Sequence, residues 1–167
     1  MKQFIKLTLI LFAAGLLLVA CTADANEGAN VAAQIADFDL PPGYTADFSV
    51  TVSGYSVAAY NPGDGHSHLY LIQSNKEEDG EALAAGLSKL VPGSGDVRMT
   101  VVENRPVTVR GQNVTAVISE GLNSENTRYR QIMVAFQGKG GPALLALSTP
   151  VSTWDETMVA NFLVSLR

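Results

Sequence analysis

Alternating apolar and polar residues occupy much of the chain after residue 37, and this pattern predicts a protein rich in β-strands. The first clear run is residues 47–52, whose apolar positions are Phe48, Val50 and Val52. Residues two apart on a strand share one face, so this run has one apolar face and one polar face. A Ser-Gly pair at 53–54 joins it to a second strand at 55–60, and a connection of two residues predicts a β-hairpin.

The same alternation continues to residue 148. Further strand segments are predicted at residues 68–73, 97–101, 107–110, 114–122, 128–137 and 142–148. Pro106 lacks a backbone donor, so the segment Asn104-Arg105-Pro106 is expected to interrupt a strand. Residues 132–136 and 143–147 are almost continuously apolar, which predicts two central strands that are covered on both faces.

Two segments have apolar residues at helical spacing. The first carries Leu83, Leu87 and Leu90 and has Ser74 or Asn75 as its expected N-cap. The second covers residues 153–166, with Thr153 as the expected N-cap. Its predicted apolar face consists of Trp154, Met158, Val159, Phe162, Leu163 and Leu166.

Together these elements predict an α+β fold. An antiparallel sheet of about six strands packs against two helices, because each element must bury its apolar face against another. We expect residues 37–167 to form this single globular domain, since they are enough for one core and too few for two.

The first 20 residues have the pattern of an export signal peptide. Lys2 and Lys6 give a positive start, and an apolar run covers residues 7–20. This run is shorter than the roughly 20 residues that a membrane-spanning helix needs. We therefore predict a signal peptide at residues 1–20. An uncleaved membrane helix is the alternative, and the short apolar run disfavours it.

The signal ends in Leu18-Val19-Ala20-Cys21, which resembles the lipobox of bacterial lipoproteins. The resemblance implies that the Cys21 thiol receives a diacylglyceryl group, that cleavage precedes Cys21, and that the new amine is acylated, for example with palmitate. Several acyl chains give stable membrane anchoring, whereas one is marginal. A soluble secretory signal with an incidental cysteine is the alternative. Cys21 is the only cysteine of the chain, so no disulfide can form within it.

Residues 21–36 are mostly small and polar, and they are predicted to be a flexible tether between lipid and domain. After cleavage, nine basic and sixteen acidic residues remain, a net charge of −7. An acidic domain does not favour binding to nucleic acid or to anionic lipid. The acyl chains on Cys21 would therefore supply the membrane attachment.

The order of elements resembles the PsbP-like and DcrB-like superfamily. The matching features are the segment Leu40-Pro41-Pro42-Gly43-Tyr44, hairpins through Gly111 and Gly138, and the final helix with Trp154 and Phe162. The family more often has tryptophan where Tyr44 stands. The resemblance implies a layered fold in an exported or lipid-anchored protein, and it carries over no catalytic motif.

Both histidines of the chain lie in the segment Asp64-Gly65-His66-Ser67-His68. On an extended segment His66 and His68 face the same side, and Asp64 can add an oxygen, so zinc or copper is the candidate ligand. A polar loop before a strand is the alternative. The metal hypothesis predicts that excess zinc raises the melting temperature by mass action, and an unchanged melting temperature would exclude it.

Three other features invite a functional interpretation. Arg128 and Arg130 can form an anion or partner patch if they share a face with Arg98 or Arg110; pairing with surface glutamates is the alternative.

Residues 138–141, Gly-Lys-Gly-Gly, lack the spacing of a phosphate-binding loop and predict a hairpin turn. The tyrosines near the first hairpin can line an aromatic groove or pack on the sheet: Tyr44, Tyr55, Tyr60 and Tyr70.

No catalytic signature is present in the sequence. It predicts a non-enzymatic binding or accessory module, anchored by lipid on the extracytoplasmic side of a bacterial cell membrane or outer membrane and meeting a protein partner there. The alternatives are a metal-binding lipoprotein that uses His66 and His68, and a hydrolase with an unrecognised site. A deep polar pocket with convergent titratable groups would favour the enzyme.

Overall fold

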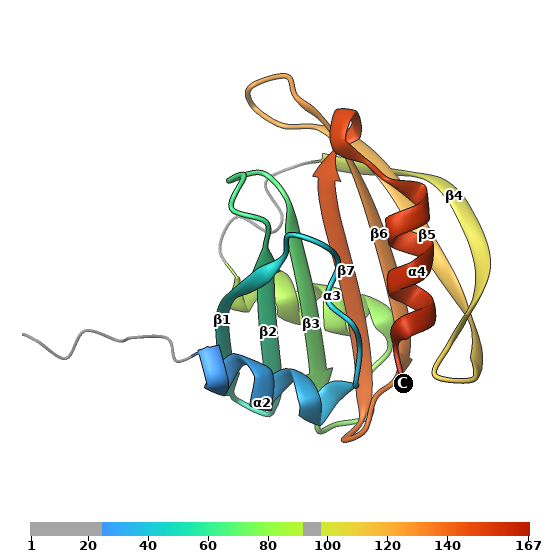
Figure 1. The fold of residues 1–167 in the computed structure, drawn as a ribbon. Coiled ribbons are helices and arrows are strands. Elements are labelled where there is room, and N and C mark those ends of the chain that lie inside the picture. The colour runs from blue at the N-terminus through green and yellow to red at the C-terminus, as the bar shows by residue number, and fades with distance from the viewer. Residues whose placement is uncertain (1–24, 92–97) are drawn as a thin grey trace, which may run out of the picture.

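A computed structural model describes residues 25–91 and 98–167, and its centre is one seven-stranded antiparallel sheet (Figure 1). The strand order is β1-β2-β3-β7-β6-β5-β4. The strands are β1 (Thr45–Val52), β2 (Tyr55–Asn61), β3 (His68–Ser74), β4 (Arg98–Val109), β5 (Gln112–Leu122), β6 (Arg128–Gln137) and β7 (Pro142–Pro150). The predicted α+β class is confirmed, with seven strands where about six were expected.

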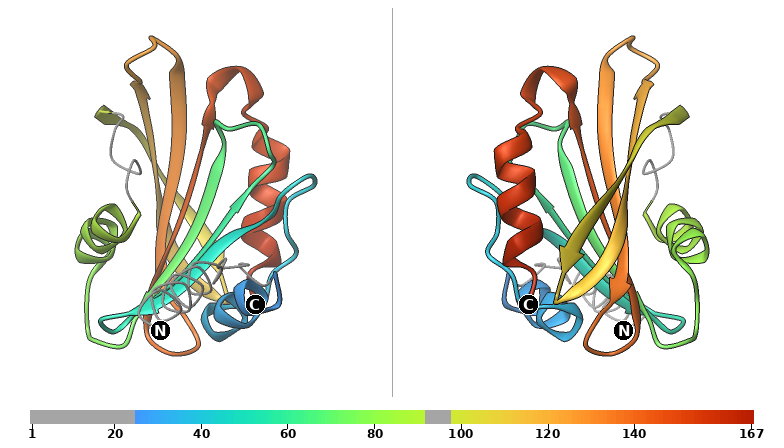
Figure 2. Two further views of the ribbon diagram at one scale, coloured as in Figure 1. Left: turned by 90° about the vertical axis from the view of Figure 1, so that its left-hand side faces the viewer. Right: turned by 90° about the vertical axis from the view of Figure 1, so that its right-hand side faces the viewer.

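Three helices cover the sheet. They are α2 (Ala25–Ile35), α3 (Gly80–Leu90) and α4 (Glu156–Ser165), and a 3-10 turn η1 (Val151–Thr153) precedes α4. Figure 2 shows α2 and α4 on one face of the twisted sheet and α3 on the other. The sequence predicted only α3 and α4.

Helix α2 corrects the prediction of a flexible tether over residues 21–36. Ala32 and Ile35 from α2, and Ala36 just after it, are buried, with 3%, 0% and 1% of their surface exposed. They belong to the main core, so this segment is part of the folded domain. Cys21, the signal peptide and the first residues of the predicted tether lie outside the described residues.

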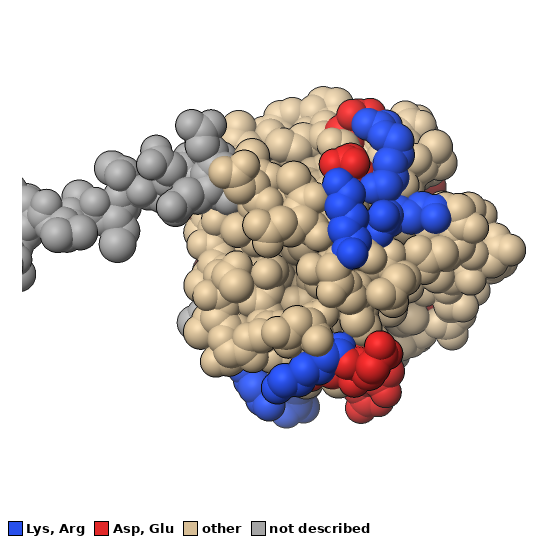
Figure 3. Space-filling model, turned by 90° about the horizontal axis from the view of Figure 1, so that it is seen from below, with Lys and Arg blue, Asp and Glu red and all other residues tan. Residues whose placement is uncertain are grey.

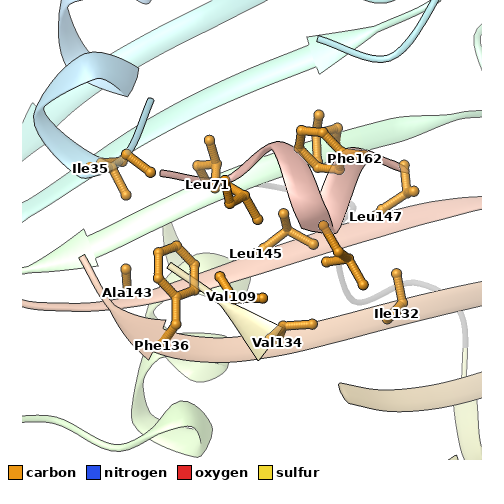
Figure 4. Close-up of a cluster of buried hydrophobic side chains, with 14 of the residues drawn as sticks. Ile35, Leu71, Val109, Ile132, Val134, Phe136, Ala143, Leu145, Leu147 and Phe162 are labelled. Atoms are coloured by element: carbon orange, nitrogen blue, oxygen red, sulfur yellow. The ribbon is translucent and has the colours of Figure 1, made fainter. Parts of the chain in front are cut away.

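The main core lies between the sheet and the helices α2 and α4 (Figure 4). Helix α4 contributes Val159, Phe162 and Leu163, as its apolar face predicts. The largest fully buried side chains of the sheet include Leu71, Ile132, Val134, Leu145 and Leu147. A smaller core on the opposite face joins α3, through Leu83 and Leu87, to Ile72 and Leu144. Strand β7 contributes to both cores, which confirms its predicted central position.

The helices begin later than the sequence predicts. Ser74 ends β3, and the amide of Asn75 donates to the carbonyl of Gly54 at 3.0 Å, so neither residue caps a helix. Asp79 caps α3 instead, because its carboxylate accepts from the amide of Ala82 at 2.9 Å. In the same way Asp155, rather than Thr153, caps α4.

Strand β4 is continuous across Pro106, where an interruption was expected. β4 is an edge strand. Edge strands tolerate proline because only one side of such a strand forms backbone hydrogen bonds with a neighbouring strand. A bulge between Val101 and Glu103 shifts the pairing of β4 with β5. The predicted hairpins through residues 53–54, through Gly111 and through residues 138–141 are all present, although the turn at Gly111 comprises residues 110–111 and Gln112 already begins β5.

Candidate functional site: an arginine-lined cleft

The carboxylate of Asp64 organises the loop that was predicted to bind a metal. One oxygen accepts from the amides of His66 and Ser67 at 2.8 and 2.7 Å, and the other accepts from the Ser67 hydroxyl at 2.6 Å. Partial burial raises the pKa of Asp64, but the hydrogen bonds from Ser67 and His66 outweigh it and hold the pKa below its ordinary value. Asp64 therefore has a structural role in this loop.

The two histidines lie in different surroundings. His66 stays in the loop, with its Nδ1 atom 3.4 Å from the hydroxyl of Tyr129. His68 begins β3, and its ring stacks on Tyr70 with 5.9 Å between the centroids. Within residues 25–91 and 98–167, no group of three or more His, Cys, Asp or Glu side chains is placed to hold a metal ion. Metal binding by this pair stays a prediction.

The tyrosines do not form one groove. Tyr44 and Tyr60 pack against the main core, whereas Tyr55 and Tyr70 pack against the smaller core on the opposite face. Tyr55 and Tyr60 are five residues apart on β2, and an odd separation puts two strand residues on opposite faces. The four tyrosines therefore pack in the cores on the two faces of the sheet, which is the alternative to an aromatic groove.

Three of the arginines, by contrast, meet at one end of the sheet. The strand register pairs Arg98 with Leu122, Leu122 with Arg128, and Glu120 with Arg130. Arg110 lies in the turn after β4, at the other end of that strand, where it donates to the carbonyl of Gln137 at 2.9 Å. Arg128 and Arg130 therefore share this end of the sheet with Arg98 and not with Arg110, and both also pair with Glu120, as the alternative of pairing with surface glutamates predicts.

Glu120 is the centre of this arginine group. Its side chain is 10% exposed, with one oxygen 2.6 Å from Arg128 Nη2 and the other 2.6 Å from Arg130 Nη2. The hydrogen bond from Arg130 lowers the pKa of Glu120 against the effect of burial, and the charges of Arg128 and Arg130 add to this. Glu120 therefore stays ionised and fixes the orientation of both guanidinium groups.

A second ion-pair group continues from this one towards α4. Arg105 pairs with Glu103 and with Glu156 of α4. The indole of Trp154 donates to Glu156 at 2.8 Å, and the guanidinium of Arg130 lies 5.5 Å from the Trp154 ring centroid. The two groups thus form one network that fixes the sheet end beside α4.

A shallow cleft of about 650 Å³ opens next to this network. Its lining consists of Arg98, Thr100, Val102, Glu120, Gly121, Leu122 and Arg128. Val102 and Leu122 are 52% and 55% exposed. The side chain of Arg128 is 66% exposed, although one of its nitrogens contacts Glu120. The cleft therefore offers cationic and apolar groups together.

The chemistry of this lining suits binding. Arg98 has no ion-pair partner among the residues that the structure describes, so its five N–H donors face the cleft or solvent. Guanidinium groups bind carboxylate or phosphate with two parallel hydrogen bonds. The lining includes no histidine or cysteine, and Thr100 supplies its one hydroxyl side chain. No nucleophile and base are paired there.

Comparisons with known proteins gave matches only among solved structures. Neither a scan of protein-family models nor a search of curated proteins gave a match. Among solved structures, the crystal structure of LpqN, involved in cell envelope biogenesis of Mycobacterium tuberculosis, is similar at 16% sequence identity and a TM-score of 0.38. The similarity covers 77% of this chain and 79% of that chain. It is too low to carry an argument about fold or function, and the PsbP-like and DcrB-like resemblance stays a prediction.

Across residues 25–91 and 98–167, each helix is too short or too polar to cross a membrane.

Proposed function

We propose that the chain is a lipid-anchored, extracytoplasmic binding module, held at a bacterial membrane through acyl chains on Cys21. The observation that carries this proposal is the sequence Leu18-Val19-Ala20-Cys21 at the end of a signal-like apolar run. As the only cysteine, Cys21 has no disulfide partner within the chain that would compete for the thiol.

The surface at the α2 end of the domain supports attachment by lipid rather than by charge. Lys139 pairs with Asp37 at 2.6 Å, and Arg167 pairs with Asp39 at 3.2 Å. Figure 3 looks at this end and shows basic side chains next to acidic ones. Because Lys139 and Arg167 are already paired, they add little attraction to anionic lipid; Arg110, at the same end, donates to the carbonyl of Gln137 and has no carboxylate partner among the described residues.

A binding role fits the arginine-lined cleft better than catalysis does. The cleft has spare guanidinium donors and exposed apolar side chains, and its lining lacks paired catalytic groups. A module that meets a partner at the membrane surface needs only such a recognition surface.

Metabolic labelling with an alkyne analogue of palmitate tests the anchor. We expect the wild-type chain to incorporate the label and Cys21→Ser to lose it completely, because serine has no thiol to receive the diacylglyceryl group. Thr22→Ser is the matched control and should be labelled like the wild type. Label that persists in Cys21→Ser, or is absent from the wild type, would refute the anchor.

A further inference from the structure

The arginine-lined cleft and helix α2 lie at opposite ends of the sheet. Strand β6 begins at Arg128 beside the cleft and ends at Gln137, a length of roughly 30 Å at about 3.3 Å per residue. Just beyond its far end, the amide of Lys139 donates to the carbonyl of Ile35 at 2.9 Å, which fixes the end of α2 there. Figures 1 and 2 show this separation, with α2 at the bottom and the turn between β5 and β6 at the top.

The position of α2 sets the orientation of the domain on a membrane. Only three residues separate Cys21 from Ala25, where α2 begins, and this four-residue step spans at most about 14 Å when fully extended. Since α2 packs into the main core, a lipid on Cys21 would hold the α2 end of the domain close to the bilayer. The cleft would then point away from that bilayer.

The charge at the cleft selects an acidic ligand. Two guanidinium groups, from Arg128 and Arg130, pair with the single carboxylate of Glu120, and Arg98 lines the same cleft without pairing with it. Glu120 pairs with Arg128 and Arg130, so Arg98 and the remaining donors of Arg128 are available to a ligand. Although the domain as a whole is acidic, the arginine-lined cleft attracts an acidic partner rather than repelling it.

The apolar groups favour a protein partner. Val102 and Leu122 are exposed beside these arginines, and the core of a protein interface buries apolar surface and is enriched in arginine relative to the rest of the surface. β4 is an edge strand, so an extended segment can approach the cleft from its open side. With the domain anchored at Cys21, the lipids of that membrane would lie at the other end of the domain, away from the cleft.

We propose that the cleft binds an acidic segment of a protein partner, one that carries an apolar residue next to its carboxylates, on the side of the domain that faces away from the anchoring membrane. This proposal rests on the proposed anchoring at Cys21. Arg98 and Arg128 bind the carboxylates, and Val102 and Leu122 contact the apolar residue.

Photocrosslinking of the full chain, in membranes of the bacterium that produces it, tests this proposal. A benzophenone amino acid replaces Val102 in the cleft, or Val164 as the matched control, since Val164 is 78% exposed on α4 and does not line the cleft. We expect position 102 to give a protein adduct that position 164 does not give. Mass spectrometry should place the adduct in a segment with Asp or Glu beside an apolar residue.

Charge reversal then tests the role of the arginines. Arg98→Glu should reduce the adduct from position 102 about tenfold or more, and an Asp or Glu to Lys change in the captured segment should restore it. Arg98→Glu should leave the fold intact, because Arg98 has no ion pair in the described part of the chain. Lys76→Glu, at an exposed cation just beyond the end of β3 on the α2 side of the domain, should leave the adduct unchanged.

Other outcomes overturn the proposal. These are no adduct from position 102, an adduct with lipid, a captured segment without acidic residues, or an adduct that Arg98→Glu does not reduce. Palmitate labelling of the same cells is measured first. If labelling succeeds and the crosslink fails, the cleft proposal is wrong while the anchor stands; if labelling fails, the anchor is wrong.

Discussion

Replacing Ile35 by alanine is expected to lower the free energy of unfolding by about 2–5 kcal/mol. The Ile35 side chain is fully buried, and it lies in the main core with residues of β6, β7 and α4. Removing three carbon atoms loses their transfer free energy and leaves a cavity that a close-packed core cannot fully close. Urea unfolding of the purified protein measures the change.

Gln34→Ala is the matched control for Ile35→Ala. Gln34 is the preceding residue of the same helix, but its side chain is exposed. Alanine favours a helix at least as well as glutamine, so this change should stay within about 0.5 kcal/mol. Equal effects of the two substitutions would mean that α2 is not part of the core and that residues 21–36 behave as the flexible tether that the sequence predicts.

The sequence does not predict helix α2, because the residues of this segment have little helical preference. Gly28 and the asparagines at 26 and 30 are weak helix formers, and a helix of 11 residues is marginal alone in water. Its stability comes from tertiary burial of Ala32 and Ile35 against the sheet, which no local pattern contains. The strands were predictable because alternation reports directly which face of each strand is buried.

The arginine-lined cleft was only partly predictable. The sequence identifies Arg98, Arg128 and Arg130 as candidates, but only the register of β4, β5 and β6 shows that they lie together at one end of the sheet. The histidines show where the alternation of side chains along a strand stops being a guide. Alternation applies within a strand, and β3 begins at His68, so His66 in the loop need not face the same side.

Replacing Gly141 by alanine is expected to cost about 3 kcal/mol or more of folding free energy. Gly141 lies in the turn between β6 and β7 with φ at +153°, and a β-carbon there would lie 2.2 Å from the carbonyl oxygen of Ser74. That oxygen belongs to the backbone at the end of β3, so it cannot rotate away as a side chain can. Relief requires a shift of the turn relative to β3, which disturbs the packing of the central strands.

Gly63→Ala separates this steric clash from the general cost of a positive φ. Gly63 has φ at +79°, and a β-carbon there would meet no atom within 4 Å. Alanine at this position should cost only about 1 kcal/mol, the penalty for left-handed backbone in a residue with a β-carbon. Urea unfolding of the two variants side by side should therefore show the larger loss for Gly141→Ala. A loss for Gly141→Ala no greater than that for Gly63→Ala would show that the turn can move away from Ser74 at little cost.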